Sequence, residues 1–219
     1  MSNDPSTTSA ITLLKKIEAA EPGNDLLQAL CKRHGESEPE GLVKDLCQDA
    51  SNTVGWILTG PAGYAECVRR AAVKIGLKEE ELSEDVTVNE LNILQACLRK
   101  HFESMDPVER EKARLEILED IGKENEETFK TVLEGTAASI LILLNAVGAQ
   151  VVRRIVFRIF VVFLSRQAVL TTARLAAMAV PFVNVLVAAW LVVDIVGPAY
   201  RKIVPSVCNI ALLRLTQSD

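Results

Sequence analysis

The chain has 219 residues, enough for one domain or two, and its net charge of −5 hides two regions of opposite charge. Residues 1–135 carry 27 acidic and 16 basic side chains, whereas residues 136–219 carry two acidic and eight basic ones. The negative balance and the acidic first region argue against nucleic-acid binding. The polar start does not have the pattern of a secretory signal peptide, so we interpret the five scattered cysteines as reduced thiols in a cytosolic protein.

Residues 1–20 predict a leader followed by a short helix. Residues 1–9 are rich in Ser, Thr, Asn, Asp and Pro, which is typical of a disordered chain end. Apolar side chains then recur at helical spacing over residues 10–20, and Ser9 precedes them as the expected N-cap.

Residues 21–135 predict an acidic, soluble bundle of helices. Asn24 is a favourable N-cap for a helix that ends at His34, because Gly35 can adopt the left-handed backbone that closes a helix. Apolar periodicity predicts further helices over residues 42–50, 64–75, 87–105, 107–122 and 124–133. No segment alternates as a strand would, so the region is predicted to be all-α.

Two of these helices begin with the pattern of a capping box, in which two residues bond reciprocally to each other's backbone N–H groups. Thr87 and Glu90 have the required spacing at one helix start, and Asp106 and Glu109 have it at the next. Pro107 follows Asp106 at the first helical position, where its missing N–H group costs nothing.

Residues 136–219 predict an apolar and basic helical region. Residues 136–152 and 175–193 contain no charged side chain and predict a helical hairpin. The intervening residues, 153–174, are apolar but contain five arginines: Arg153, Arg154, Arg158, Arg166 and Arg174. A last apolar run covers residues 203–213. The predicted fold is therefore all-α, an acidic helical bundle followed by an apolar, arginine-rich helical hairpin region.

This pattern predicts a non-enzymatic protein on the cytoplasmic face of a membrane, where it could perturb the bilayer. A span through residues 153–174 would place Arg158 and Arg166 in hydrocarbon, at a cost of about 3 kcal/mol each. Two arrangements remain open: a hairpin within the cytoplasmic leaflet, or a hairpin buried in the bundle and released by lipid or a partner. The five arginines are the candidate contacts to anionic lipid, and in a closed state they would pair with the acidic helices.

Four polar residues near the end of the hydrophobic region are candidates for a latch that holds the hairpin to the bundle. They are Asp194, Tyr200, Arg201 and Arg214. Asp194 and Arg201 bracket the break at Gly197 and Pro198, close enough to pair. The alternative is ordinary helix-end capping, with the long side chains extending to the membrane surface.

Catalytic and metal sites have few candidates in this sequence. The two histidines, His34 and His101, are interpreted as structural, His34 because an imidazole interacts favourably with the end of a helix. Cys31, His34 and Cys47 could be imagined as metal ligands, but they lack a fourth ligand and paired spacing. Buried small thiols are the preferred interpretation, and no cofactor or metal is expected.

Three stretches carry a resemblance to a known family: residues 51–78, residues 88–106, and the sharpest one, Ala199-Tyr-Arg-Lys-Ile-Val-Pro-Ser-Val-Cys-Asn-Ile-Ala-Leu-Leu-Arg214. They resemble the YaaW-type family of uncharacterised bacterial proteins, sometimes grouped with the ubiquinol–cytochrome c chaperone superfamily. That family is Gly-rich around its apolar hairpin, whereas bulky Val and Ile dominate here. The resemblance implies a fold and a bacterial source but no established activity.

The expected partner is anionic membrane lipid, on which the chain could form oligomers. The alternative function belongs to a different class: a soluble assembly chaperone or interaction module whose apolar groove holds a hydrophobic client protein. A membrane-perturbing protein would leak dye from empty vesicles, whereas a client binder would leave them intact.

Overall fold

The structure is a computed structural model that describes residues 4–51, 62–135, 137–148, 151–152, 200–215 and 217. Apart from the turns and loops that connect them, the elements of these residues are all helices and include no strand, so the predicted all-α fold is confirmed. The chain divides into two compact units. Unit 1 comprises Met1–Ile93 and Val193–Gln217, and unit 2 comprises Leu94–Val192 and Ser218–Asp219.

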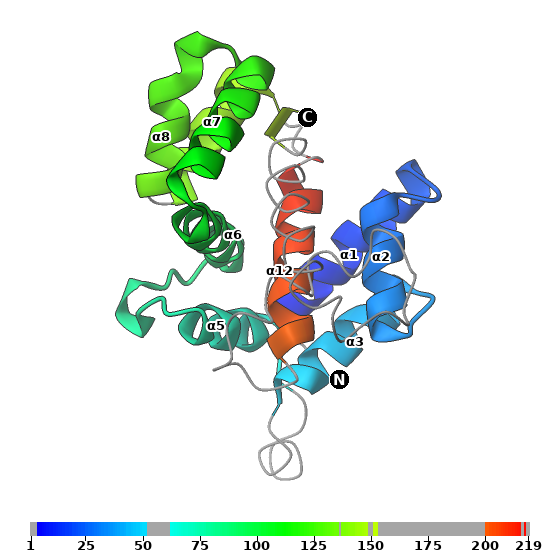
Figure 1. Cartoon of the computed structure of the whole chain (residues 1–219). Coiled ribbons are helices and arrows are strands. Elements are labelled where there is room, and N and C mark those ends of the chain that lie inside the picture. Colours follow the sequence, from blue (N-terminus) through cyan, green and yellow to red (C-terminus); the bar gives the residue numbers. More distant parts are fainter. Residues whose placement is uncertain are drawn as a thin grey trace, which may run out of the picture. The chain divides into compact units, whose positions relative to one another are not determined.

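Unit 1 combines helices from the two ends of the sequence (Figure 1). Its described elements are α1 (Pro5–Ala20), α2 (Asp25–His34), α3 (Pro39–Ala50), α5 (Tyr64–Lys74), the 3-10 helix η1 (Glu79–Glu81), the start of α6 (Val86–Ser104) and α12 (Tyr200–Leu215). The prediction for α2 is confirmed, because Asn24 Oδ1 accepts from the N–H groups of Leu26 and Leu27, and Gly35 has a φ of 70°. A helix was predicted to start at residue 42, but α3 begins at Pro39, which suits the first helical position.

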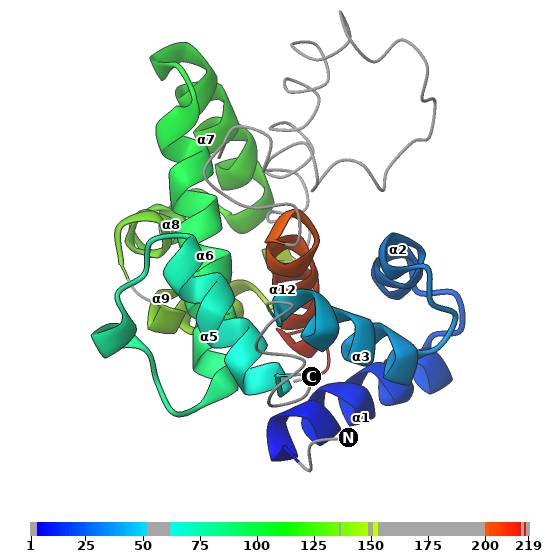
Figure 2. The same ribbon diagram turned by 90° about the horizontal axis from the view of Figure 1, so that it is seen from below.

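The last helix, α12, is the centre of unit 1. It contacts α1, α2, α3 and α5, and the two views of Figures 1 and 2 show it among them. Every side chain from Ile203 to Leu213 is buried, which is the pattern of a helix enclosed by others. The sequence placed this apolar run in the hydrophobic region of residues 136–219, and the structure packs it into the core with residues such as Leu14 and Leu42.

The start of α1 differs from the prediction of a disordered leader over residues 1–9, which is wrong for residues 4–9. Asp4 is the N-cap, and α1 begins at Pro5. The hydroxyl oxygens of Ser6 and Thr7 accept from the backbone N–H groups of Ala65 and Tyr64, at 2.8 and 2.9 Å. These are the first two residues of α5, so polar residues that resemble a leader serve as caps for a second helix.

A second polar contact holds the C-terminal end of α3 against α5. Glu66 in the first turn of α5 accepts hydrogen bonds from Arg69 and Arg70. Arg70 Nη1 in turn donates to the carbonyl oxygen of Ala50, the last residue of α3, at 2.8 Å. The hydrogen bonds from Arg69, followed by those from Arg70, lower the pKa of Glu66 to about 2. Burial alone would raise this pKa, but it offsets the effect of the arginines only in part.

Unit 2 is built from the rest of α6, then α7 (Pro107–Ile121), the 3-10 helix η2 (Lys123–Asn125), α8 (Glu126–Glu134) and α9 (Ala137–Val147). The capping box of Asp106 and Glu109 is confirmed. Gln95 Nε2 donates to the carbonyl oxygens of Val132 and Gly135 at 3.2 and 2.6 Å, which satisfies acceptors at the end of α8. Phe102 and Phe129 pack edge to face with ring centroids 5.8 Å apart.

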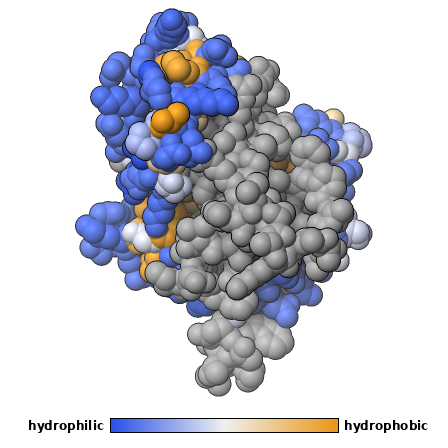
Figure 3. Space-filling model, in the orientation of Figure 1, coloured by the Kyte–Doolittle hydropathy of each residue, from blue (hydrophilic) through white to orange (hydrophobic). Residues whose placement is uncertain are grey.

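The first predicted hairpin segment, residues 136–152, begins as a helix but does not continue as one over its whole length. α9 covers only Ala137–Val147, and Gly148 follows with a φ of 80°. Among the described helices, none combines the length and the apolar character needed to cross a bilayer. On the face drawn in Figure 3 the described helices carry mostly hydrophilic side chains, with small hydrophobic patches between them.

The contact between α1 and α5 predicts the effect of removing two hydroxyls. The Ser6→Ala/Thr7→Val variant should lose about 1–2 kcal/mol of unfolding free energy, because two N–H groups at the start of α5 lose their acceptors. Urea unfolding followed by circular dichroism measures this loss. Thr8→Val, at an exposed position of the same turn, is the control and should change stability by less than about 0.5 kcal/mol; an equal loss in both variants would refute the capping role.

The depressed pKa of Glu66 predicts a dependence of stability on pH. Because the pKa of this carboxyl is about 2 in the folded chain against an ordinary value of 4.5, its contribution is fully present above pH 4.5 and is lost as the pH falls toward 2. Glu66→Gln should therefore lower the Tm near neutral pH, and the difference from the parent should shrink below pH 4.5. Glu84→Gln, an exposed carboxylate of the same unit, provides the comparison; a difference that is constant with pH would contradict this assignment.

Candidate functional site

Two polar groups join α12 to the helices around it, and they form the candidate functional site. The first, the His34 cluster, consists of His34, Asp45, Asp49, Lys202 and Ser206. The second, the Glu90 triad, consists of Tyr64, Glu90 and Arg214. Both lie within unit 1.

His34 occupies a fixed position because it is the last residue of α2 and Gly35 turns the chain directly after it. Its side chain has an exposed fraction of 0%, and it lies between α3 and α12. Nδ1 is 2.6 Å from Asp45 Oδ2 on α3, and Nε2 is 2.8 Å from Ser206 Oγ on α12. One imidazole thus joins the consecutive helices α2 and α3 to α12, which is distant from them in sequence.

The contact with a carboxylate establishes the direction of these bonds. An ionised carboxylate only accepts, so the imidazole carries its proton on Nδ1 and donates it to Asp45 Oδ2. Nε2 then presents its lone pair toward Ser206 Oγ. The Ser206 hydroxyl also lies 2.8 Å from the backbone carbonyl oxygen of Lys202, one turn earlier in α12, so its single proton has two acceptors within reach.

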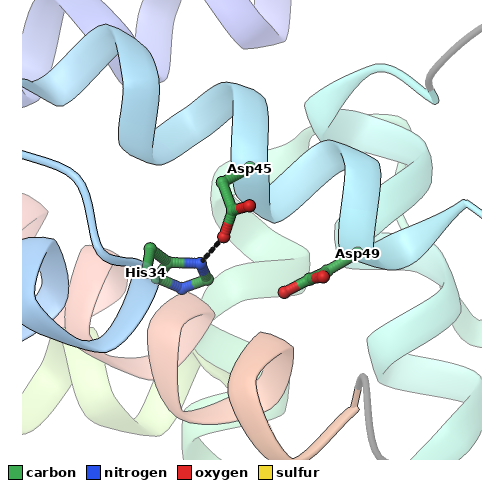
Figure 4. Close-up of side chains that lie close together, drawn as sticks. All are labelled: His34, Asp45 and Asp49. Carbon is green, nitrogen blue, oxygen red and sulfur yellow. Dashed lines mark hydrogen bonds and ion pairs between the residues drawn. The ribbon is translucent and has the colours of Figure 1, made fainter.

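Asp49 completes the His34 cluster from the next turn of α3. Figure 4 shows its carboxylate directed into the space beside the imidazole, from the same helix as Asp45. Asp49 Oδ2 is a buried atom with no hydrogen bond from the described residues, although the Lys202 ammonium lies 3.5 Å away as an ion-pair partner. Burial lowers the pKa of His34, and the hydrogen bond with Asp45 only partly offsets this, so the neutral imidazole is favoured.

The order Ser206, His34 and Asp45 matches that of a Ser-His-Asp relay, which calls for a chemical assessment. A serine nucleophile must reach a substrate, but Ser206 is fully buried and lies within a helix. Its hydroxyl also has a second acceptor besides the imidazole, the backbone carbonyl oxygen of Lys202. This geometry supports a structural and ligand-holding role for the cluster, not acyl transfer.

The Glu90 triad lies farther along α12. Arg214 Nε and Nη2 donate to Glu90 Oε2 and Oε1 at 2.8 and 3.0 Å, and the Tyr64 hydroxyl donates to Oε1 at 2.9 Å. Glu90 and Tyr64 are fully buried. Burial, reinforced by the Glu90 charge, raises the pKa of Tyr64 well above its ordinary value, so the phenol remains a donor. For Arg214, burial alone would lower the pKa, but the bonds to Glu90 outweigh it and raise the pKa.

The predicted capping box of Thr87 and Glu90 is wrong, because Glu90 faces the core instead of the helix start. α6 begins one residue earlier, at Val86, and the Thr87 N–H donates to Asp85 Oδ1 at 2.8 Å. Asp85 therefore provides the capping carboxylate at the start of α6 in place of Thr87, and Glu90 is available to bind Arg214.

The other predicted site residues have different positions. Among the predicted latch residues, Arg214 belongs to the Glu90 triad, and Tyr200 and Arg201 lie in the first turn of α12 with side chains outside the described part. Asp194 and all five predicted lipid contacts lie outside the described residues: Arg153, Arg154, Arg158, Arg166 and Arg174. His101 lies in α6, and its side chain is likewise outside them.

The sequence interpretation did not find the His34 cluster. A weak signal was present, because Asp45 and Asp49 are four residues apart and share one face of a helix. The contribution of α12 could not be predicted, since Ser206 follows His34 by 172 residues.

His34 does not group with Cys31 and Cys47 as potential metal ligands. Within the described residues, the one group with metal-binding potential is His34, Asp45 and Asp49. Burial raises the pKa of Cys47 to about 12, so its thiol stays protonated at neutral pH.

Comparisons of the chain with protein-family models, with curated proteins and with solved structures found no match. The resemblance to the YaaW-type family therefore stays a prediction from the quoted motifs.

The Glu90 triad predicts a large loss of stability when one partner is removed. Arg214→Met should reduce the unfolding free energy by about 3–5 kcal/mol, because it leaves the Glu90 carboxylate buried without its cation. The double variant Glu90→Gln/Arg214→Met should recover part of this loss, which urea unfolding measures. Arg99→Met removes an exposed ion pair and should cost no more than about 1 kcal/mol; equal losses in the single and double variants would show that the charge pair is not responsible.

Proposed function

We propose that this chain is a non-enzymatic, membrane-associating protein. Its apolar, arginine-bearing residues 153–199 contact the cytoplasmic face of a membrane, while α12, which follows them, stays in unit 1. One observation carries the proposal: residues 153–199 are followed directly by α12, a helix buried in the core of unit 1. The chain thus joins a sequence suited to lipid to a folded anchor.

The sequence between the described parts supplies the membrane-contacting element. Residues 153–199 contain five arginines and one acidic residue, Asp194, in an otherwise uncharged and mainly apolar sequence. Arginine can place its alkyl stem along apolar surface while its guanidinium reaches anionic headgroups. Each basic residue near an anionic membrane contributes about 1 kcal/mol of attraction.

The anchor is supported by the contacts of α12. Lys202 pairs with Asp49, Ser206 bonds to His34, and Arg214 bonds to Glu90. These contacts are spread along the helix, and the last one involves a carboxylate fully buried in unit 1. Pulling α12 out of unit 1 would leave these polar groups without their partners, so the helix resists withdrawal while the preceding residues contact lipid.

The described acidic helices supply cations for many of their own carboxylates, which bears on the partner of the five arginines. Glu66 binds Arg69 and Arg70, and Glu111 binds Arg114. These pairs lie wholly within residues 1–135. They favour anionic headgroups over the acidic helices as the partner of the arginines.

The helix α9, in the apolar segment of residues 136–152, also presents apolar side chains to solvent. In α9, Leu141 and Ile142 have exposed fractions of 42% and 57%, while Ile140 and Leu143 on the other face are buried. An exposed apolar pair next to a long apolar sequence is suited to contact with a bilayer surface.

The full chain should co-float with liposomes that contain anionic lipid. Charge reversal of Arg153, Arg154 and Arg158 to Glu should reduce flotation by about tenfold or more, because three attractions of about 1 kcal/mol each become repulsions. The control reverses three basic residues of the first region, Lys15, Lys78 and Lys112, all more than half exposed, with the same change in net charge.

The comparison of the two triple variants separates the possible outcomes. A loss of flotation specific to the arginine variant supports the proposal, and flotation that survives high salt indicates apolar insertion as well. Equal flotation of both variants removes the arginines as lipid contacts. A parent chain that never floats contradicts membrane association and favours the client-binding alternative.

A further inference from the structure

We infer that His34, Asp45 and Asp49 form a binding site for a divalent transition-metal ion of the zinc type, which ties α2 to α3 beside α12. The site lies entirely in unit 1, and zinc binding there does not require residues 153–199 to contact a membrane. Its ligands would be one imidazole nitrogen and two carboxylate oxygens.

The ligand atoms converge without a change of fold. One atom from each of His34, Asp45 and Asp49 lies within 4.8 Å of the other two, and Figure 4 shows all three side chains around one space. A tetrahedral zinc ion with bonds of about 2.1 Å places its ligand atoms about 3.4 Å apart. Closing the site therefore moves a side-chain atom by at most about 1.4 Å, within the reach of an aspartate rotamer.

The surroundings of His34 suit a metal-bound histidine. Such a histidine donates its second ring N–H to an acceptor that fixes the tautomer. Nδ1 lies 2.6 Å from Asp45 Oδ2, and a metal ion would replace the proton that Nδ1 donates to this oxygen. The ring proton would then lie on Nε2, and Ser206 Oγ is 2.8 Å away to accept it while the Ser206 hydroxyl donates to the Lys202 carbonyl oxygen.

Asp49 supplies the third ligand, and its carboxylate already attracts a cation, the Lys202 ammonium. Asp49 Oδ2 is buried and accepts no hydrogen bond from the described residues, and its carboxylate is directed toward the other two ligands. The Lys202 ammonium at 3.5 Å pairs with this oxygen at a distance beyond a good hydrogen bond. Lys202 is therefore a weak occupant that a divalent ion would displace.

The donor set selects the class of ion. One nitrogen and two carboxylate oxygens suit zinc and its neighbours, whereas calcium and magnesium prefer six or more oxygen ligands. Three protein ligands leave the fourth position to water, on the side where Asp45 and Asp49 remain about one quarter exposed.

The test titrates the full chain, stripped with a chelator and kept reduced, with zinc chloride alone while calorimetry and thermal unfolding are recorded. We expect one zinc ion per chain and a raised Tm, with magnesium and calcium chloride giving neither. Asp49→Asn should weaken zinc binding by about tenfold or more, and Ser206→Ala by about tenfold. Lys202→Met should tighten zinc binding, because it removes the competing ammonium.

Two controls make the result specific to this site. Glu40→Gln removes another carboxylate of α3 with the same charge change, and Cys31→Ser removes the thiol nearest to His34 in sequence. Both should bind zinc as the parent does. Each variant is first checked for its metal-free Tm, and Asp45→Asn replaces Asp49→Asn if the latter does not fold. The inference is overturned if Asp49→Asn and Glu40→Gln bind alike, if Cys31→Ser abolishes binding, or if the parent takes up no zinc.

Discussion

Unit 1 depends on one insertion: a helix from beyond residue 199 fills the space between helices formed by the first 74 residues. Without α12, the inner faces of α1, α2, α3 and α5 would lose the side chains that cover them. The side chains of residues 203–213 are buried on every side of α12, and such a helix is stable in water only when neighbours surround it. This mutual burial also encloses the side chains of His34, Ser206 and Glu90, which contribute to the polar contacts of α12.

The polar contacts act differently from the apolar ones. Apolar packing tolerates small rotations and shifts of a helix. The bidentate bond between Arg214 and Glu90, in contrast, fixes both the rotation of α12 about its axis and its position along that axis. The bond between Ser206 and His34 fixes the same helix near its middle. Together they select one position of α12 in a core that is otherwise composed of interchangeable aliphatic side chains.

The sequence predicted local structure well where the signal lay within a few residues. Asn24 and Gly35 bound α2 as expected, and Asp106 with Glu109 caps α7, because capping is a contact between near neighbours. The prediction failed at Glu90, where a distant arginine competed for a carboxylate that was also suitable for a cap. It also failed at Ser6 and Thr7, since nothing local indicates that their hydroxyls serve another helix. For the candidate site, the sequence alone shows that Asp45 and Asp49 are spaced to share one face of a helix. The contact of Ser206 with His34 could be found only from the tertiary fold.

The insertion of α12 also has a consequence for the order of events during synthesis. More than one hundred residues, 94–199, separate the rest of unit 1 from the helix that completes it. At roughly 5–20 residues per second, a ribosome needs about 5–20 s to make them. Over that interval the nascent chain has its first helices without their core, while the most apolar part of the sequence emerges. A nearby bilayer or a chaperone would therefore meet residues 153–199 before unit 1 closes.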